Sequence, residues 1–196
     1  TETDESERRQ KEFEERSQLF MDTMNVDEVV AQLLVSEGFS SLEEVAYVET
    51  DELLMIEGFD QDTVDELQAR ARESLEEINA KSIAEARELG VAQDLIDFEG
   101  LSPQMLVALG KDDVKSLEDF ATCADWELAG GYTTVDGERH KDDGVLESFE
   151  VNIQEAQDMI MRARLQIGWV TEEQLAEDAA AAEAANADTN SEGAET

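Results

Sequence analysis

Acidic side chains are the groups of this sequence that could do chemistry, because 51 of its 196 residues are Asp or Glu. Adjacent carboxylates such as Glu43/Glu44 and Asp112/Asp113 could share a proton or hold a divalent cation. Acid–base catalysis also needs an apolar pocket that raises a carboxyl pKa, and no pair is flanked by residues that would supply one. At this density of acid, close pairs arise by chance. We interpret them as solvated faces and expect no enzyme, with a carboxylate-based hydrolase as an alternative that would require such a pocket or a metal.

Metal and thiol chemistry find equally little support. His140 is the only histidine and has no Cys or second His beside it, so it does not predict a zinc site. The segment 136–144 is rich in Asp and Gly but lacks the calcium-loop spacing and its twelfth-position glutamate. Cys123 is the only cysteine, which excludes an internal disulfide and favours a reducing compartment. We expect no metal or cofactor, an exposed His140, and a Cys123 that is buried as a small apolar residue.

Two glycine turns could bind phosphate. Ile56-Glu57-Gly58-Phe59 lies between a short and a long predicted helix, and Phe98-Glu99-Gly100-Leu101 is similar to it. Both resemble helix-hairpin-helix turns, which in nucleic-acid-binding proteins present backbone N–H groups and a helix N-terminus to a phosphate. Here Glu57 and Glu99 precede the glycines, and their carboxylates would repel that phosphate. The sequence therefore predicts the scaffold without its nucleic-acid chemistry.

The net charge restricts the partners further. It is −37 at pH 7, with 14 Lys and Arg in the chain. Such a chain repels nucleic acid and anionic lipid, because both are bound largely through Lys and Arg. It is drawn instead to basic protein surfaces, in a salt-dependent manner. There is no long apolar run and no secretory signal pattern, so we expect a cytoplasmic protein that contacts no membrane.

The sequence repeats itself. Ser41-Leu42-Glu43-Glu44-Val45-Ala46 returns 75 positions later as Ser116-Leu117-Glu118-Asp119-Phe120-Ala121. Downstream, Ala71-Arg72 returns 92 positions later as Ala163-Arg164, so the second copy contains 17 additional residues. Because the apolar positions are kept while the polar ones drift, one supersecondary module is used twice. A pair of binding platforms explains this better than a single catalytic site does.

Each copy has the periodicity of short helices. In the first, an apolar stripe predicts a helix over 26–37 that ends at Gly38, and Ser41 with Glu44 fits a capping box for a short helix over 42–47. Thr50 is expected to cap a second short helix, and Asp60 a long helix over 61–80 that continues to about residue 90. In the second, Pro103 begins a helix and the last long helix covers 153–167. The extra segment is expected to form an exposed loop or small hairpin.

The chain resembles the C-terminal region of the NusA family of bacterial transcription factors, in an alphaproteobacterial-like form. The resemblance is carried by segments in both copies, namely Ser6-Glu7-Arg8-Arg9-Gln10, Leu19-Phe20-Met21, residues 25–39, residues 41–48, Ile56-Glu57-Gly58-Phe59, Phe98-Glu99-Gly100, Ser116-Leu117-Glu118-Asp119, Met161-Arg162-Ala163-Arg164 and Trp169. It implies an all-α fold of two tandem helix-hairpin-helix bundles, called acidic repeats. The composition predicts a helical linker between them and a disordered acidic C-terminal tail. The chain departs from the family pattern at Gly110-Lys111-Asp112-Asp113, in the insertion and in the tail.

The predicted organisation follows from the repeat and the resemblance. Residues 1–23 are expected to be the end of a preceding KH domain or a linker helix, so the chain is expected to be part of a longer protein. The rest divides into a first repeat (24–80), a linker (81–90) and a second repeat (91–170) with an insertion at about 129–145. An Ala- and Glu-rich tail (171–196) follows, which is expected to begin as a frayed helix.

The resemblance implies a non-enzymatic role in transcription elongation, termination and antitermination. The expected partners are RNA polymerase, through the C-terminal domain of its α subunit, the protein's own KH and S1 RNA-binding domains, and other antitermination factors. We expect a monomer whose exposed carboxylates bind these partners, with the candidates Glu43, Glu44, Glu57, Asp97, Glu99, Glu118 and Asp119. The alternative is a helix-hairpin-helix nucleic-acid-binding module, in which Arg162 and Arg164 would contact RNA.

Overall fold

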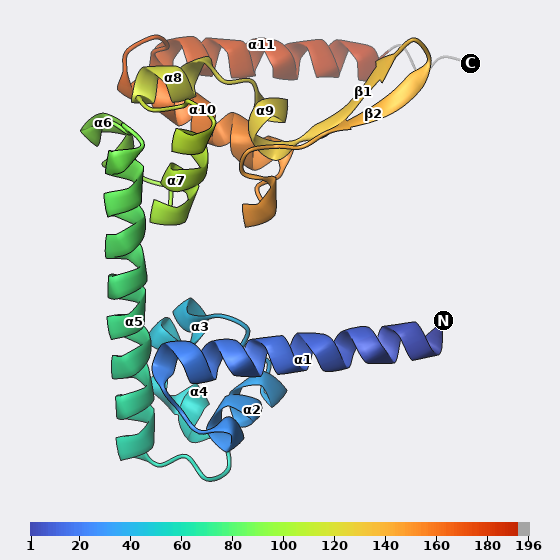
Figure 1. The fold of residues 1–196 in the computed structure, drawn as a ribbon. Helices are drawn as coiled ribbons and strands as arrows, with labels where there is room; N and C mark the ends of the chain where they lie inside the picture. The colour runs from blue at the N-terminus through green and yellow to red at the C-terminus, as the bar shows by residue number, and fades with distance from the viewer. Residues whose placement is uncertain (192–196) are drawn as a thin grey trace. The chain divides into compact units, whose positions relative to one another are not determined.

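The computed structural model describes residues 1–191, and of 188–191 only the backbone. It divides into two compact units, Thr1–Lys81 and the chain from Ser82 onward (Figure 1). The division falls inside one continuous helix, α5 (Gln61–Glu88), which includes both the predicted long helix and its continuation. The prediction of an all-α fold is confirmed, since a single two-stranded hairpin is the only sheet among the described residues.

The first unit packs four helices against the N-terminal half of α5. These helices are α1 (Glu2–Met24), α2 (Glu28–Ser36), α3 (Leu42–Tyr47) and α4 (Thr50–Leu54). Most of α1 is exposed and carries pairs such as Arg9–Glu5, 3.2 Å apart, but its last turns bury Phe20 and Met24 in the core of the unit. The remaining core residues come from every helix and turn of the unit: Ala31, Leu34, Leu42, Val45, Ala46, Leu53, Ile56, Phe59, Val64, Leu67, Ala71 and Leu75.

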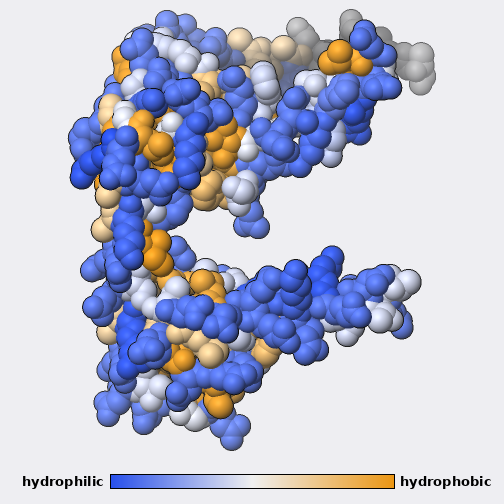
Figure 2. Space-filling view, in the orientation of Figure 1, coloured by the Kyte–Doolittle hydropathy of each residue, from blue (hydrophilic) through white to orange (hydrophobic). Residues whose placement is uncertain are grey.

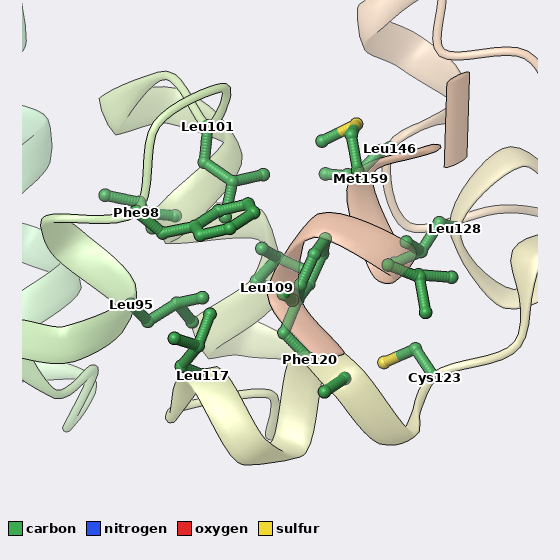
Figure 3. Packing of buried hydrophobic residues seen from close by; sticks show 14 of the residues in the cluster. Leu95, Phe98, Leu101, Leu109, Leu117, Phe120, Cys123, Leu128, Leu146 and Met159 are labelled. Atoms are coloured by element: carbon green, nitrogen blue, oxygen red, sulfur yellow. The ribbon is translucent and has the colours of Figure 1, made fainter. Parts of the chain in front are cut away.

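The second unit repeats this arrangement with different side chains. The helices of the repeat in this unit are α6 (Gln93–Ile96), α7 (Pro103–Lys111), α8 (Leu117–Thr122), α9 (Asp125–Ala129) and α10 (Ile153–Gln166). Phe98 and Phe120 meet at its centre with ring centroids 5.7 Å apart (Figure 3). Leu109 and Leu128 are completely buried there, as are Leu34 and Leu53 at the matching positions of the first unit. The two repeats thus bury the same positions of the same module.

The predicted caps are mostly confirmed. The Ser41 and Ser116 hydroxyls accept the N–H groups of Glu44 and Asp119 at the starts of α3 and α8. Asp60 accepts the Thr63 N–H at 2.8 Å, and α7 begins at Pro103 behind Ser102. The predicted cap at Thr50 is wrong: α4 starts one residue earlier than expected, with Glu49 in the cap position, and the Thr50 hydroxyl donates to Gln68 instead.

Left-handed backbone conformations mark the same three corners in each repeat. In the first they are at Asn25, Gly38 and Gly58, with φ of 53°, 96° and 93°. In the second they are at Gly100, Asp113 and Glu150, with φ of 105°, 62° and 61°. Glycine adopts this conformation freely, whereas a side chain makes it costly. The departure from the family pattern at Asp112-Asp113 therefore leaves the turn in place, with Asp113 in the conformation of Gly38.

The insertion forms the hairpin that the sequence analysis allowed for. Strands β1 (Gly131–Val135) and β2 (Glu138–Asp142) pair antiparallel, from Gly131 opposite Asp142 to Val135 opposite Glu138. Asp136 and Gly137 both have positive φ, which fits the tight turn that matches strand twist. A short 3₁₀ helix, η1 (Glu147–Phe149), leads from the hairpin toward α10.

Helical structure extends far along the acidic tail. Helix α11 runs Glu172–Ser191, and almost all of its described side chains are exposed. Alanine-rich sequence favours helix even without a face to bury. The predicted frayed helix is therefore present over 172–191, and the predicted disordered end falls in part on residues 192–196, which lie outside the described residues.

Candidate interaction surfaces

The repeated Arg-Ala-Arg motif is used inside each repeat. Ala71 and Ala163 are fully buried on α5 and α10. Next to them, Arg72 donates from Nε to the Ala46 carbonyl at 3.1 Å, and Arg164 donates in the same way to the Ala121 carbonyl at 2.9 Å. Those carbonyls lie near the C-terminal ends of α3 and α8, where helices leave acceptors unpaired and a cation is favourable. The second arginine of the motif therefore caps the short helix.

The first arginine of the motif ties the same long helix to the opening turn of the repeat. Arg70 donates from Nη1 to the Asn25 carbonyl at 3.0 Å, and Arg162 from Nη1 to the Glu99 carbonyl at 3.4 Å. Arg162 also lies over the Phe98 ring, 5.8 Å from its centroid. A Cβ atom at Gly100 would stand 2.8 Å from Arg162 Nη2, so glycine makes room for this contact. Four of the 14 basic residues are thus engaged in holding the repeats together.

The helix-hairpin-helix turns present carboxylates. Glu57 is exposed beside Gly58, where α4 passes to α5. Although the sequence of 98–101 is similar, the position of the second repeat that matches Gly58 is Glu150, in the turn before α10. Glu99 and Gly100 instead match the turn at Asn25 that precedes α2. Both turns that lead into a long helix therefore carry an exposed acidic residue.

Each repeat has a groove at the same place, and the sequence analysis missed both. The α3 groove of the first repeat has a volume of about 380 Å³ and is lined by Glu37, Gly38, Phe39, Glu43, Glu44, Tyr47, Val48 and Glu52. The α8 groove of the second has a volume of about 440 Å³ and is lined by Asp112, Asp113, Val114, Asp119, Thr122, Cys123, Trp126, Glu127, Leu128, Asp143 and Val145. Seven of the eight positions of the α3 groove recur in the α8 groove at the repeat spacing of 75 residues.

Both grooves combine an acidic rim with apolar and aromatic side chains. The α3 groove has four glutamates and the α8 groove four aspartates and one glutamate, and neither is lined by Lys or Arg. Tyr47 is 71% exposed at the first groove and Trp126 50% exposed at the second. The face of the molecule in Figure 2 is largely hydrophilic, with scattered hydrophobic patches. An exposed aromatic next to carboxylates is a surface suited to a basic, partly apolar partner.

The seven predicted partner-binding residues are divided between these grooves and other faces. All seven are exposed. Glu43 and Glu44 line the α3 groove and Asp119 the α8 groove, whereas Glu57, Asp97, Glu99 and Glu118 line neither. Two of the groove residues cap helices: Glu44 accepts the Ser40 N–H at 2.9 Å, and Asp119 accepts the Ser116 N–H at 3.2 Å. As capping residues, these two carboxylates are less free to bind a partner.

The remaining chemical candidates lie where the sequence placed them. His140 is exposed on β2. Cys123 is buried on the floor of the α8 groove, where burial first, and then the charges of Glu127, Asp112 and Asp119, raise its pKa to about 11. A thiol with that pKa is protonated at neutral pH and is a poor nucleophile. Within residues 1–191, no group of three or more acidic, His or Cys side chains could hold a metal ion. No helix of that part is long and apolar enough to cross a membrane.

Comparisons with known proteins agree with this geometry. Residues 25–73 match the family model of the SAM-like helix-hairpin-helix tandem, and this segment contains α2, α3, α4 and the first part of α5. The chain is 39% identical over 119 residues to the transcription termination/antitermination protein NusA of Rickettsia prowazekii. It is equally similar to NusA of Rickettsia conorii. This chain is thus similar to one part of the NusA proteins.

The aligned part covers 61% of this chain and 24% of each Rickettsia NusA, so the chain spans about a quarter of the length of these relatives. The family resemblance and the helix-hairpin-helix fold predicted from the sequence are thereby confirmed. The Rickettsia proteins are named for the termination and antitermination of transcription.

Proposed function

We propose that this chain is a non-enzymatic protein-interaction region of a cytoplasmic transcription elongation, termination and antitermination factor. Its two acidic repeats dock onto basic surfaces of the transcription machinery. The partners are the C-terminal domain of the RNA polymerase α subunit, the KH and S1 RNA-binding domains of the same protein, and other antitermination factors. The observation that carries the proposal is the matched pair of acidic grooves, because the chain has kept a surface of the same sign and position in both repeats.

The use of the arginines supports a protein partner over the nucleic-acid alternative. Arg70, Arg162 and Arg164 would be natural phosphate ligands, but each donates to a backbone carbonyl of its own repeat. The turns that could present backbone N–H groups to a phosphate carry Glu57 and Glu150. With a net charge of −37, the chain has little to offset the cost of approaching a polyanion.

The direct test is an NMR titration of the ¹⁵N-labelled full chain with the purified α C-terminal domain from the same organism. It is run at about 50 mM and about 300 mM salt, because screening weakens contacts between exposed charges. We expect localised shifts in one or both repeats that shrink at the higher salt. If neither this domain nor the KH domains cause such shifts, the proposal is wrong. The nucleic-acid alternative predicts that the chain binds RNA. Loss of RNA binding in an Arg162→Gln/Arg164→Gln variant that keeps its fold would favour this alternative.

A further inference from the structure

The α8 groove contains an aromatic residue for which the first repeat offers no precedent. Trp126 lies on α9 with half of its surface exposed, at a position that is occupied by Asp51 in the first repeat. The first repeat has its exposed aromatic side chain, Tyr47, on α3, where the second has Thr122. The second repeat has therefore moved the aromatic side chain of its groove from one helix to the next.

The insertion completes the wall of this groove. At the end of the hairpin, Val145 donates its N–H to the Glu127 carbonyl at 2.9 Å, and Leu146 donates to the Leu128 carbonyl at 2.8 Å. These bonds hold the segment after β2 against α9 and bring Asp143 and Val145 to the groove. Gly130 and Gly144 approach so closely that a Cβ atom at Gly144 would collide with the Gly130 backbone. The first repeat has no such wall, because it lacks the hairpin.

The electrostatics of the groove favour a cation. Its lining contains five carboxylates and no basic side chain. Lys115 and Lys141 reach Asp113 and Asp143 from outside it, at 3.2 and 3.6 Å, but both aspartates are highly exposed and such pairs are weak and easily exchanged. The raised pKa of Cys123 on the floor reflects the same field, after the larger effect of burial. A negative rim around the face of an indole is the arrangement that attracts a guanidinium or ammonium group.

We propose that the α8 groove binds an arginine- or lysine-rich segment of a protein partner, with a basic side chain stacked on Trp126 and paired with Asp112 and Asp143. The proposal rests on the proposed function, since it names the surface and the partner chemistry through which the second repeat docks. Arginine fits best, because its planar guanidinium stacks on an aromatic ring and pairs with carboxylates at the same time.

The first measurement uses Trp126 as its own reporter. The chain has two tryptophans, so a Trp169→Phe variant of the full chain leaves Trp126 as the only one. Trp169 is half exposed beyond the end of α10, where phenylalanine is a mild change. The probe is a ten-residue glycine–arginine peptide, and its control is the same peptide with citrulline, which is neutral and of similar shape. We expect a saturable change in Trp126 fluorescence with the arginine peptide and none with the citrulline peptide.

The second measurement is the anisotropy of the labelled arginine peptide with variants of the chain. We expect Trp126→Leu to weaken binding about 3- to 10-fold, as loss of a cation–π contact does. Asp112→Asn/Asp143→Asn should weaken it more than Glu173→Gln/Glu177→Gln, a pair of exposed residues on α11 that changes the net charge equally. Equal effects of the two acidic pairs, or peptide saturation without a change in Trp126 fluorescence, would overturn the proposal.

The two proposals fail differently. If the α C-terminal domain or the KH domains bind while Trp126 fluorescence stays constant in the Trp169→Phe chain, the groove is wrong and the proposed function stands. If the arginine peptide occupies the groove while neither domain binds the chain, the groove is right and the partners named under the proposed function are wrong.

Discussion

The first repeat keeps glycine at two corners where the second repeat has acidic residues. Gly38 and Gly58 correspond to Asp113 and Glu150, and all four have positive φ. At the third corner the glycine is in the second repeat: Gly100 corresponds to Asn25 of the first. A side chain at Gly100 would collide with Arg162. The comparison shows that the module requires a left-handed backbone at three corners. The residue at each corner can vary, but a residue other than glycine costs backbone free energy there.

The repeats also differ in the side chain of the long helix that lies at one matched, buried position. In the first, Gln68 is buried and donates to the Val45 and Val48 carbonyls at 3.3 and 2.9 Å. In the second, Ile160 is buried at that position. The arginine cap is common to both, at Arg72 and Arg164. The common contact thus identifies what the fold needs, and the differing one shows where each core has been adjusted.

The largest expected effect tests whether the two cores are equivalent. Leu34→Ala and Leu109→Ala each remove a fully buried side chain at the same position of the module, and each should destabilise its own repeat by about 3 to 5 kcal/mol. The measurement is urea unfolding followed by the NMR amide signals of each repeat. If one substitution costs less than half as much as the other, the cores are not equivalent.

A smaller effect tests the shared arginine cap. Arg72→Ala and Arg164→Ala should each destabilise their repeat by about 1 to 2 kcal/mol, because a charge-assisted hydrogen bond to a helix-end carbonyl is lost. The same unfolding experiment measures it. Lys81→Ala, which breaks only an exposed pair with Glu77, serves as the control and should change stability by less than about 0.5 kcal/mol. An effect of the arginine substitutions no larger than the control would show that the cap is dispensable.

Exchanging the corner residues sharpens the comparison directly. Gly58→Glu should destabilise the first repeat and Glu150→Gly should stabilise the second, each by about 1 kcal/mol, because a side chain with positive φ is strained. Thermal unfolding of each variant measures the change. Glu150→Ala keeps a Cβ atom and should bring no such gain, so stabilisation by alanine as well as glycine would point to charge instead of backbone strain.

The smallest effect concerns the ion pair that only the second repeat has. Lys141 Nζ lies 3.0 Å from Glu147 Oε1, and this contact lowers the pKa of Glu147 below its ordinary 4.5 and raises that of Lys141 above 10.5. The lowered pKa favours the folded state above the ordinary value, and this contribution is lost as pH falls through the folded-state pKa. The raised pKa of Lys141 also favours the folded state, and this contribution is lost as pH rises through the folded-state pKa.

An NMR pH titration of the Glu147 carboxyl carbon measures this contribution. Lys141→Met should return its pKa toward 4.5, with the Gly144 N–H still holding it slightly lower. Because both groups are exposed, the change in stability should be barely measurable. A Glu147 pKa that is unchanged in Lys141→Met would show that the hairpin base is held by its backbone alone.

The sequence predicted the helices because their signals are local. Ser41, Asp60 and Pro103 act within a turn of their own helix, and the periodicity of the apolar residues marks the faces that are buried. The prediction at Thr50 failed for the opposite reason, since its hydroxyl is used by Gln68, 18 residues away. Ile78 continues the apolar periodicity of the long helix, yet it is 37% exposed. Periodicity alone does not show how far along a helix its partners extend.

The candidate site was predicted only in part. Exposed carboxylates could be chosen by spacing, and Glu43, Glu44 and Asp119 do line the grooves. The grooves themselves are formed by residues from two short helices and the turn before them and, in the second repeat, from the end of the hairpin. A signal was available, because the groove positions recur at the repeat spacing, but it becomes visible only when the structure shows which of them face one cavity.

The sequence by itself determined that this chain is all-α, acidic and duplicated, because composition, periodicity and self-similarity are properties of the chain alone. It also indicated the NusA family through short segments in both repeats. Only the tertiary structure decided what the Arg-Ala-Arg motif does, since its acceptors at Ala46 and Ala121 are far away in the sequence. The same holds for the carboxylates, which look alike until the packing of distant helices makes some of them caps and others the rim of a groove.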